Sequence, residues 1–150
     1  MELTSEESAI VIGLHRMVSD LDHKTAQICK THGLTLGQFA VLEALYHKGD
    51  LTVGELKESV LSTDGTIPVI IGNLEKRSLV TRTQAPEDRR KFIISLTDKG
   101  RELACETMPE NNQVLKEQLS ILTKEDRKLL LEMILRCRQA QRRGIKNQNI

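Results

Sequence analysis

The chain has 150 residues, a net charge of +1 and 39% hydrophobic residues, a balance typical of one globular domain rather than a disordered chain. It lacks an apolar run of about eighteen residues and starts with an acidic, polar segment, so we expect no membrane helix, no secretory signal and a cytoplasmic location. Phe39, Tyr46 and Phe92 are its only aromatic residues, too few for the stacking platforms of single-strand binders.

Apolar residues recur at helical spacing over residues 6–30, which predicts a first helix with Gly33 as its C-terminal stop. Two capping-box patterns follow: Thr35 with Gln38, and Thr52 with Glu55, each opening a short helix. A third short helix is predicted to run to about residue 77, with its N-cap among residues 62–64. Short helices joined by tight turns indicate a helix-turn-helix.

Residues 79–84 and 92–96 are rich in β-favouring side chains and are predicted to be two strands. The polar loop between them makes the pair a hairpin. The tip of this hairpin is basic and comprises Arg89, Arg90 and Lys91.

The C-terminal third is predicted to be helical. Thr97 is expected to cap a helix that begins near Asp98, and Pro109 is expected to break or kink that helix. Thr123, with Asp126 three residues later, is predicted to cap a last helix that gives way to a polar tail at 144–150. Its apolar positions fall on one side: Leu129, Leu130, Met133, Ile134 and Cys137.

A helix-turn-helix followed by a basic hairpin is a winged helix, in which one helix fits the DNA major groove and the wing reaches the minor groove. Residues 1–64 hold five basic and ten acidic groups, whereas residues 76–101 hold eight basic and three acidic groups, a local net charge of +5. Salt screening makes phosphate attraction a local effect, so this basic segment favours DNA binding.

The third short helix has an apolar stripe, with its opposite side available to DNA. Candidate DNA contacts on and around it are Ser62, Thr63, Asp64, Thr66, Pro68, Val69, Asn73 and Lys76. Candidate contacts in the hairpin are Arg82, Asp88, Arg89, Arg90 and Lys91. Asp88 stands two residues before Arg90, so its carboxylate could hold the guanidinium in a fixed pose for groove insertion. The alternative, for the outer side of this helix and for the hairpin, is an ordinary solvated surface without a binding role.

These motifs resemble the MarR family (multiple antibiotic resistance regulators) over residues 34–101. The matching segments are Leu-Thr-Leu-Gly-Gln-Phe-Ala-Val-Leu from Leu34, Asn-Leu-Glu-Lys-Arg-Ser-Leu-Val from Asn73, Pro-Glu-Asp-Arg-Arg-Lys from Pro86, and Ile-Ser-Leu-Thr-Asp-Lys-Gly from Ile94. The resemblance implies a mainly α fold: a winged helix-turn-helix at about 34–101 with a two-stranded wing, flanked by dimerisation helices at 1–33 and 102–143.

The resemblance also implies a dimeric, sequence-specific regulator that binds a pseudo-palindromic duplex and acts as a repressor released by a small phenolic or aromatic effector. It makes residues 62–76 the recognition helix, Arg90 the minor-groove arginine and Asp88 its partner, with Arg89 and Lys91 near phosphates. Two positions depart from the family pattern: Ser78 stands where glycine is usual, and Val69 where a polar residue is common.

The sequence can be compared with three kinds of signal-sensing site: a metal site, a reactive cysteine and a small-molecule pocket. Zinc-responsive relatives place histidines after the wing, whereas His15, His23, His32 and His47 all precede it, so we expect no metal site. Peroxide sensors carry a reactive cysteine early in the first helix, whereas Cys29 lies near its end. The three cysteines, scattered without CxxC spacing, are expected to be packed residues.

A small-molecule pocket is therefore the favoured sensor, with His15, Arg16 and Phe39 as candidates. A redox regulator that uses Cys29 is an alternative, and so is a winged-helix module that binds protein instead of DNA. The chain has no GxGxxG, phosphate-loop, HExxH or GxSxG motif, so we expect neither an enzyme nor a cofactor.

Overall fold

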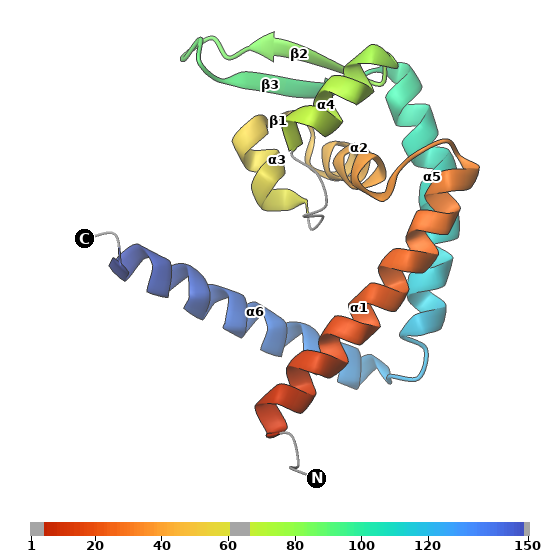
Figure 1. The fold of residues 1–150 in the computed structure, drawn as a ribbon, viewed down its shortest axis with the longest axis vertical. Helices are drawn as coiled ribbons and strands as arrows, with labels where there is room; N and C mark the ends of the chain where they lie inside the picture. Colours follow the sequence, from red (N-terminus) through yellow and green to blue (C-terminus); the bar gives the residue numbers. More distant parts are fainter. Residues whose placement is uncertain (1–4, 61–66, 149–150) are drawn as a thin grey trace. The chain divides into compact units, whose positions relative to one another are not determined.

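A computed structural model describes residues 5–60 and 67–148, with side chains through residue 144. The long first helix is α1 (Glu6–Thr31) (Figure 1). It begins where Ser5 Oγ accepts a hydrogen bond from the Ser8 amide at 3.2 Å. It ends at His32, and Gly33 follows with φ +70°, a left-handed conformation that glycine adopts without strain. The predicted first helix and its glycine stop are therefore confirmed.

Three short helices follow: α2 (Leu36–Lys48), α3 (Val53–Ser59) and α4 (Ile67–Lys76). Both predicted capping boxes are present. The Gln38 amide donates to Thr35 Oγ1 at 3.1 Å, and the Glu55 amide donates to Thr52 Oγ1 at 3.2 Å. The predicted N-cap of α4, at residues 62–64, lies outside the described residues.

The sheet has three strands, one more than the sequence predicted. β2 (Val80–Gln84) and β3 (Phe92–Leu96) form the expected antiparallel hairpin. β1 (Leu51–Thr52) pairs with the other edge of β3, giving the order β1-β3-β2. A two-residue strand is too short for an alternating pattern, so only its tertiary partner reveals it.

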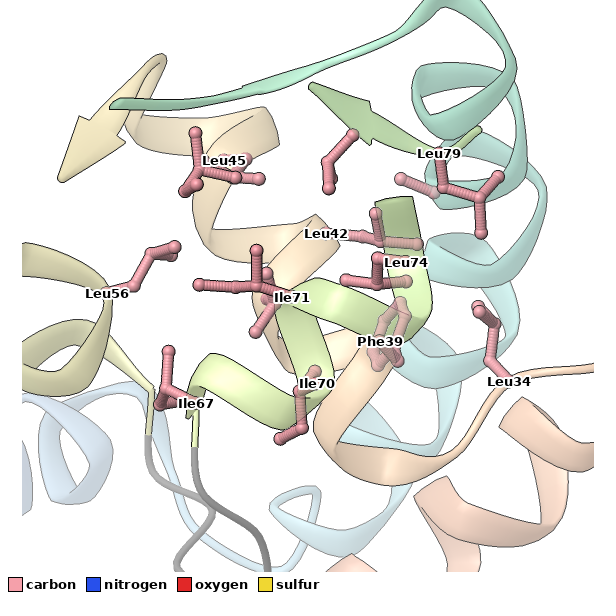
Figure 2. Close-up of a cluster of buried hydrophobic side chains, with 14 of the residues drawn as sticks. Leu34, Phe39, Leu42, Leu45, Leu56, Ile67, Ile70, Ile71, Leu74 and Leu79 are labelled. Carbon is pink, nitrogen blue, oxygen red and sulfur yellow. The ribbon is translucent and has the colours of Figure 1, made fainter. Parts of the chain in front are cut away.

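A mostly aliphatic cluster of buried side chains joins these elements (Figure 2). Its fully buried members include Phe39, Leu42, Leu45, Leu56, Ile71, Leu74, Leu79 and Ile94. They come from α2, α3, α4, β3 and the turn before β2, so the same core fixes α4 and the root of the wing.

The junction between α4 and β2 has unusual backbone requirements. Ser78 has φ +58°, in the left-handed region, which accounts for the usual glycine at this position. Gly100, in the first turn of α5, lies so close to the Leu79 carbonyl that a Cβ atom would overlap it. Thr97 Oγ1 donates to the Ser78 carbonyl at 2.7 Å, which ties the start of α5 to this turn.

The helix α5 (Asp98–Gln118) passes through Pro109 without interruption, so the predicted break is wrong, while the alternative, a kink at Pro109, stays a prediction. Proline lacks the N–H that would bond four residues back, a loss that usually ends a helix. Here tertiary contacts hold both flanks, because Met108 and Asn111 are buried on either side of Pro109 and Thr25 Oγ1 of α1 donates to Asn111 Oδ1 at 2.7 Å.

The last helix, α6 (Lys124–Gln148), begins with the predicted reciprocal cap between Thr123 and Asp126. It continues through most of the predicted polar tail, because the stretch after residue 143 contains no proline to stop a helix. The chain divides into two compact units, residues 1–114 and 115–150. Among the described helices, none is long and apolar enough to cross a membrane.

Candidate nucleic-acid interface

The helix α4, which the sequence predicts to be the recognition helix, has two opposite faces, as expected. The buried face comprises Ile67, Ile70, Ile71 and Leu74. The exposed face comprises Pro68, Val69, Asn73 and Lys76. Val69 is 61% exposed, whereas the isoleucine and leucine side chains of this helix are buried. The remaining candidates of this element, Ser62, Thr63, Asp64 and Thr66, lie outside the described residues.

The tip of the wing holds one arginine in a fixed pose. Arg90 Nε donates to Asp88 Oδ1 at 3.1 Å and Nη2 donates to Oδ2 at 3.2 Å, while the Arg90 amide donates to Oδ1 at 3.0 Å. These hydrogen bonds hold the pKa of the Asp88 carboxyl below its ordinary value. The Arg90 side chain nonetheless remains 90% exposed. The carboxylate therefore orients the guanidinium without burying it.

Backbone hydrogen bonds close the wing loop around this arginine. The Lys91 amide donates to the Asp88 carbonyl at 3.0 Å, and the Ala85 amide donates to the Lys91 carbonyl at 2.9 Å. The side chains of Arg89 and Lys91 are exposed beside it. Three cations are thus presented on a loop whose backbone is held in place.

Four other basic residues of the segment 76–101 contact protein groups. Arg77 Nη1 donates to the Gly33 carbonyl at 2.7 Å, and Lys99 Nζ donates to the Arg77 carbonyl at 3.2 Å. Arg82 pairs with Glu75, and the Arg101 guanidinium lies 5.5 Å from the centre of the Tyr46 ring. Of these four, Arg82 is paired with a carboxylate, while the other three keep their charge but direct their side chains to groups of the protein.

A cleft of about 640 Å³ brings several predicted contacts together. Its lining includes Pro68 of the recognition helix with Arg82, Arg90 and Lys91 of the wing. Thr52, Val53, Gly54, Glu55, Glu58 and Phe92 complete it, and sequence reasoning missed all six. No local motif marks them, because they join the cleft only when β1 and α3 pack beside the wing.

The candidate sensor residues occupy different environments. Phe39 is 2% exposed and belongs to the hydrophobic core, whereas His15 and Arg16 are exposed on α1.

Cys29 is fully buried, and burial raises its pKa to about 11, which disfavours the thiolate that redox chemistry needs. Cys105 and Cys137 are exposed, so the prediction that every cysteine is packed is wrong for these two. Among the residues described, no cluster of three His, Cys, Asp or Glu side chains could hold a metal ion.

Comparisons with known proteins agree with this geometry. The family "Transcriptional regulator SarA/Rot" matches residues 23–107. The HTH-type transcriptional regulator MhqR of Bacillus subtilis is 33% identical over 135 residues, which cover 89% of this chain and 92% of that protein.

Two solved structures have the same fold. Bordetella bronchiseptica BpsR, described as regulated in its DNA binding by 6-hydroxynicotinic acid, is 25% identical with a TM-score of 0.76 and covers 91% of this chain and 96% of its own. Streptomyces coelicolor Sco3205, a MarR family regulator solved in complex with DNA, is 23% identical with a TM-score of 0.79 and covers 93% and 90%.

Proposed function

Because the chain belongs to the MarR family of winged-helix transcriptional regulators, we propose that it binds duplex operator DNA as a homodimer through α4 and the wing. The observation that carries the proposal is at the wing tip, where Asp88 accepts two hydrogen bonds from the Arg90 guanidinium while the Arg90 side chain stays 90% exposed. An exposed, oriented guanidinium loses little conformational entropy when it enters a narrow minor groove.

The exposed face of α4 suits the major groove. Asn73 can present its amide to a base edge, and Val69 and Pro68 can contact thymine methyl groups. Lys76, together with Arg89 and Lys91 of the wing, supplies charge for phosphates, which fixes the register of the protein on the duplex. The candidate contacts at 62–66 remain predictions for the start of this helix.

A second copy of the chain is the proposed partner of α1 and α6. Among the described residues, α6 buries no side chain, yet it carries Leu129, Leu131, Met133, Ile134 and Leu135 at exposures of 40% or more. The first half of α1 likewise exposes Ile10, Val11, Ile12, Leu14 and Val18. Apolar faces of this extent are typical of an obligate homodimer, and a two-fold dimer matches a pseudo-palindromic operator.

We further propose that the protein is a repressor released by a small hydroxylated aromatic effector. BpsR, whose DNA binding 6-hydroxynicotinic acid regulates, supports this class of ligand. His15 and Arg16 on α1 are accessible and suit a carboxylate or phenol, whereas Phe39 could face a ligand only if the hydrophobic core opened beside it. The high pKa of Cys29 makes a redox switch at that residue the weaker alternative.

The test is binding to DNA from upstream of the protein's own gene, measured by fluorescence anisotropy at several salt concentrations. Wild-type protein should bind one duplex tightly against unspecific competitor, with an affinity that falls as salt rises. Weak binding to every duplex would instead favour a protein partner for the winged lobe.

Arg90→Ala should weaken operator binding by about 1–3 kcal/mol and reduce the preference for the operator over other duplexes. Arg89→Ala is the matched control, because removing a cation that binds phosphate should weaken binding to all duplexes equally. Asp88→Asn removes a negative charge, so simple electrostatics predicts tighter binding, whereas the proposed orienting role predicts weaker binding. An unchanged preference in Arg90→Ala would refute the minor-groove assignment.

A further inference from the structure

Arg82 of β2 is held by a carboxylate of the recognition helix. Its Nε donates to Glu75 Oε1 at 3.0 Å, and its Nη2 lies 2.8 Å from the same oxygen. Both side chains are about one-third exposed, at 33% for Arg82 and 35% for Glu75. The sequence suggested Arg82 as a DNA contact, but its charge is already paired within the protein.

The aromatic ring of Phe92, on β3 of the wing, also contacts the Arg82 guanidinium. The Arg82 Cζ atom lies 5.5 Å from the centre of the Phe92 ring. Phe92 pairs with Gln84, so it is the diagonal neighbour of Arg82 on the same face of the hairpin. The Arg82 guanidinium therefore joins both strands of the wing to α4, through a cation–π contact and an ion pair.

This position matters for the cleft beside the wing. Arg82 lines that cleft together with Pro68 at the start of α4 and Arg90 at the wing tip. Along the chain, α4 and β2 are connected only by residues 77–79. The shared core packs α4 against the root of the wing, and the contact between Glu75 and the middle of β2 adds a polar attachment farther along the strand.

We propose that Arg82 and Glu75 form a clamp that sets the spacing between the recognition helix and the wing, and that Arg82 acts on DNA binding as a positioning residue rather than by binding phosphate. The inference rests on the proposed DNA-binding function. A fixed spacing lets α4 and Arg90 engage adjacent grooves together, so disruption of the clamp weakens binding even though every side chain that touches DNA is still present.

Glu75→Gln separates the two roles by the sign of its effect. If Arg82 binds a phosphate, removing its competing carboxylate tightens binding. If the pair is a clamp, the same change weakens operator binding, by up to about fivefold for a partly exposed ion pair. Glu87→Gln in the wing loop is the matched control, since Glu87 is exposed and has no ion pair among the described residues.

Arg82→Gln adds a second measurement. As a clamp variant it should weaken binding at least as much as Glu75→Gln, with the slope of log affinity against log salt unchanged. If Arg82 instead neutralised a phosphate, its replacement would lower that slope by about 0.9. The charge-swapped pair Glu75→Arg with Arg82→Glu should recover part of the affinity if the two residues act through each other, and should bind worst if Arg82 touches DNA.

Hydrogen exchange without DNA keeps the clamp testable on its own. Amides of β2 and β3 should exchange faster in Arg82→Gln, whereas amides of α2 should not change. Failure of the wild-type protein to bind any duplex would overturn the proposed function, yet faster exchange in the wing would still support the clamp. Tighter binding of Glu75→Gln, a reduced salt slope in Arg82→Gln, or unchanged wing exchange would overturn the clamp.

Discussion

The interior of the winged lobe and the outer helices contain the same kinds of apolar residue in opposite environments. Ile71 and Leu74 of α4 are fully buried within one chain, whereas Leu131 of α6 is 57% exposed and Val11 of α1 is 65% exposed. Helical periodicity predicts an apolar face in both regions, but it does not predict which part of the protein or which partner covers that face. The lobe completes its own core, whereas the outer helices leave apolar side chains exposed in the single chain.

The largest effect should come from charging the open face of α6. In a two-fold dimer, Ile134→Glu would place a carboxylate in each half of the interface. The buried apolar side chain that is lost in each half contributes about 1.5–3 kcal/mol. The affinity between the two protomers should therefore fall by roughly 100-fold or more. Sedimentation across a concentration series measures this. Lys128→Glu on the same helix is the control, and an unaltered dimer in Ile134→Glu would mean that this face is not the interface.

A cavity in the lobe should have the next largest effect. Leu74→Ala removes a fully buried side chain from α4 and should lower the free energy of unfolding by about 2–5 kcal/mol. Urea denaturation at one protein concentration gives the value. Leu131→Ala is the matched change on α6, and its destabilisation should depend on protein concentration because it acts through the dimer. If Leu74→Ala and Leu131→Ala destabilise the protein equally and independently of protein concentration, then Leu131 does not act through a dimer.

The polar contact between α1 and α5 should have an intermediate effect. Thr25→Val keeps the side-chain shape but leaves Asn111, which is 4% exposed, without its 2.7 Å hydrogen bond to residue 25. An unpaired buried amide costs about 1–3 kcal/mol, again measured by urea denaturation. Thr31→Val, at an exposed threonine of the same helix, should cost much less; a comparable cost would show that burial of this pair is not what matters.

The smallest effect should appear at the start of α6 in acid. The hydrogen bonds with Thr123 hold the pKa of Asp126 below its ordinary value. A lowered folded-state pKa stabilises α6 above the ordinary carboxyl pKa, and this stabilisation disappears as the pH falls through the folded value. Asp126→Asn should therefore flatten the acid branch of a helicity titration slightly. An acid branch identical to that of the wild type would contradict this.

Much of the winged lobe could be predicted because its signals are local. A cap acts over three residues, so the pairs Thr35–Gln38 and Thr123–Asp126 define helix starts without any knowledge of the fold. The exposed and buried faces of α4 follow from helical spacing, and Asp88 lies two residues from Arg90. Sequence separations this short leave few geometries open, which is why these predictions are confirmed.

Tertiary structure alone decided the features that depend on distant partners. β1 exists because Leu51 lies opposite Ile94 on β3, and α5 continues through Pro109 because its flanking residues are packed. Arg82 likewise looked like any basic wing residue until Glu75 was found 2.8 Å from it. Sequence determined where elements begin and which faces are apolar, since these depend on near neighbours; which charges remain available to a ligand depended on contacts that form only when the chain is folded.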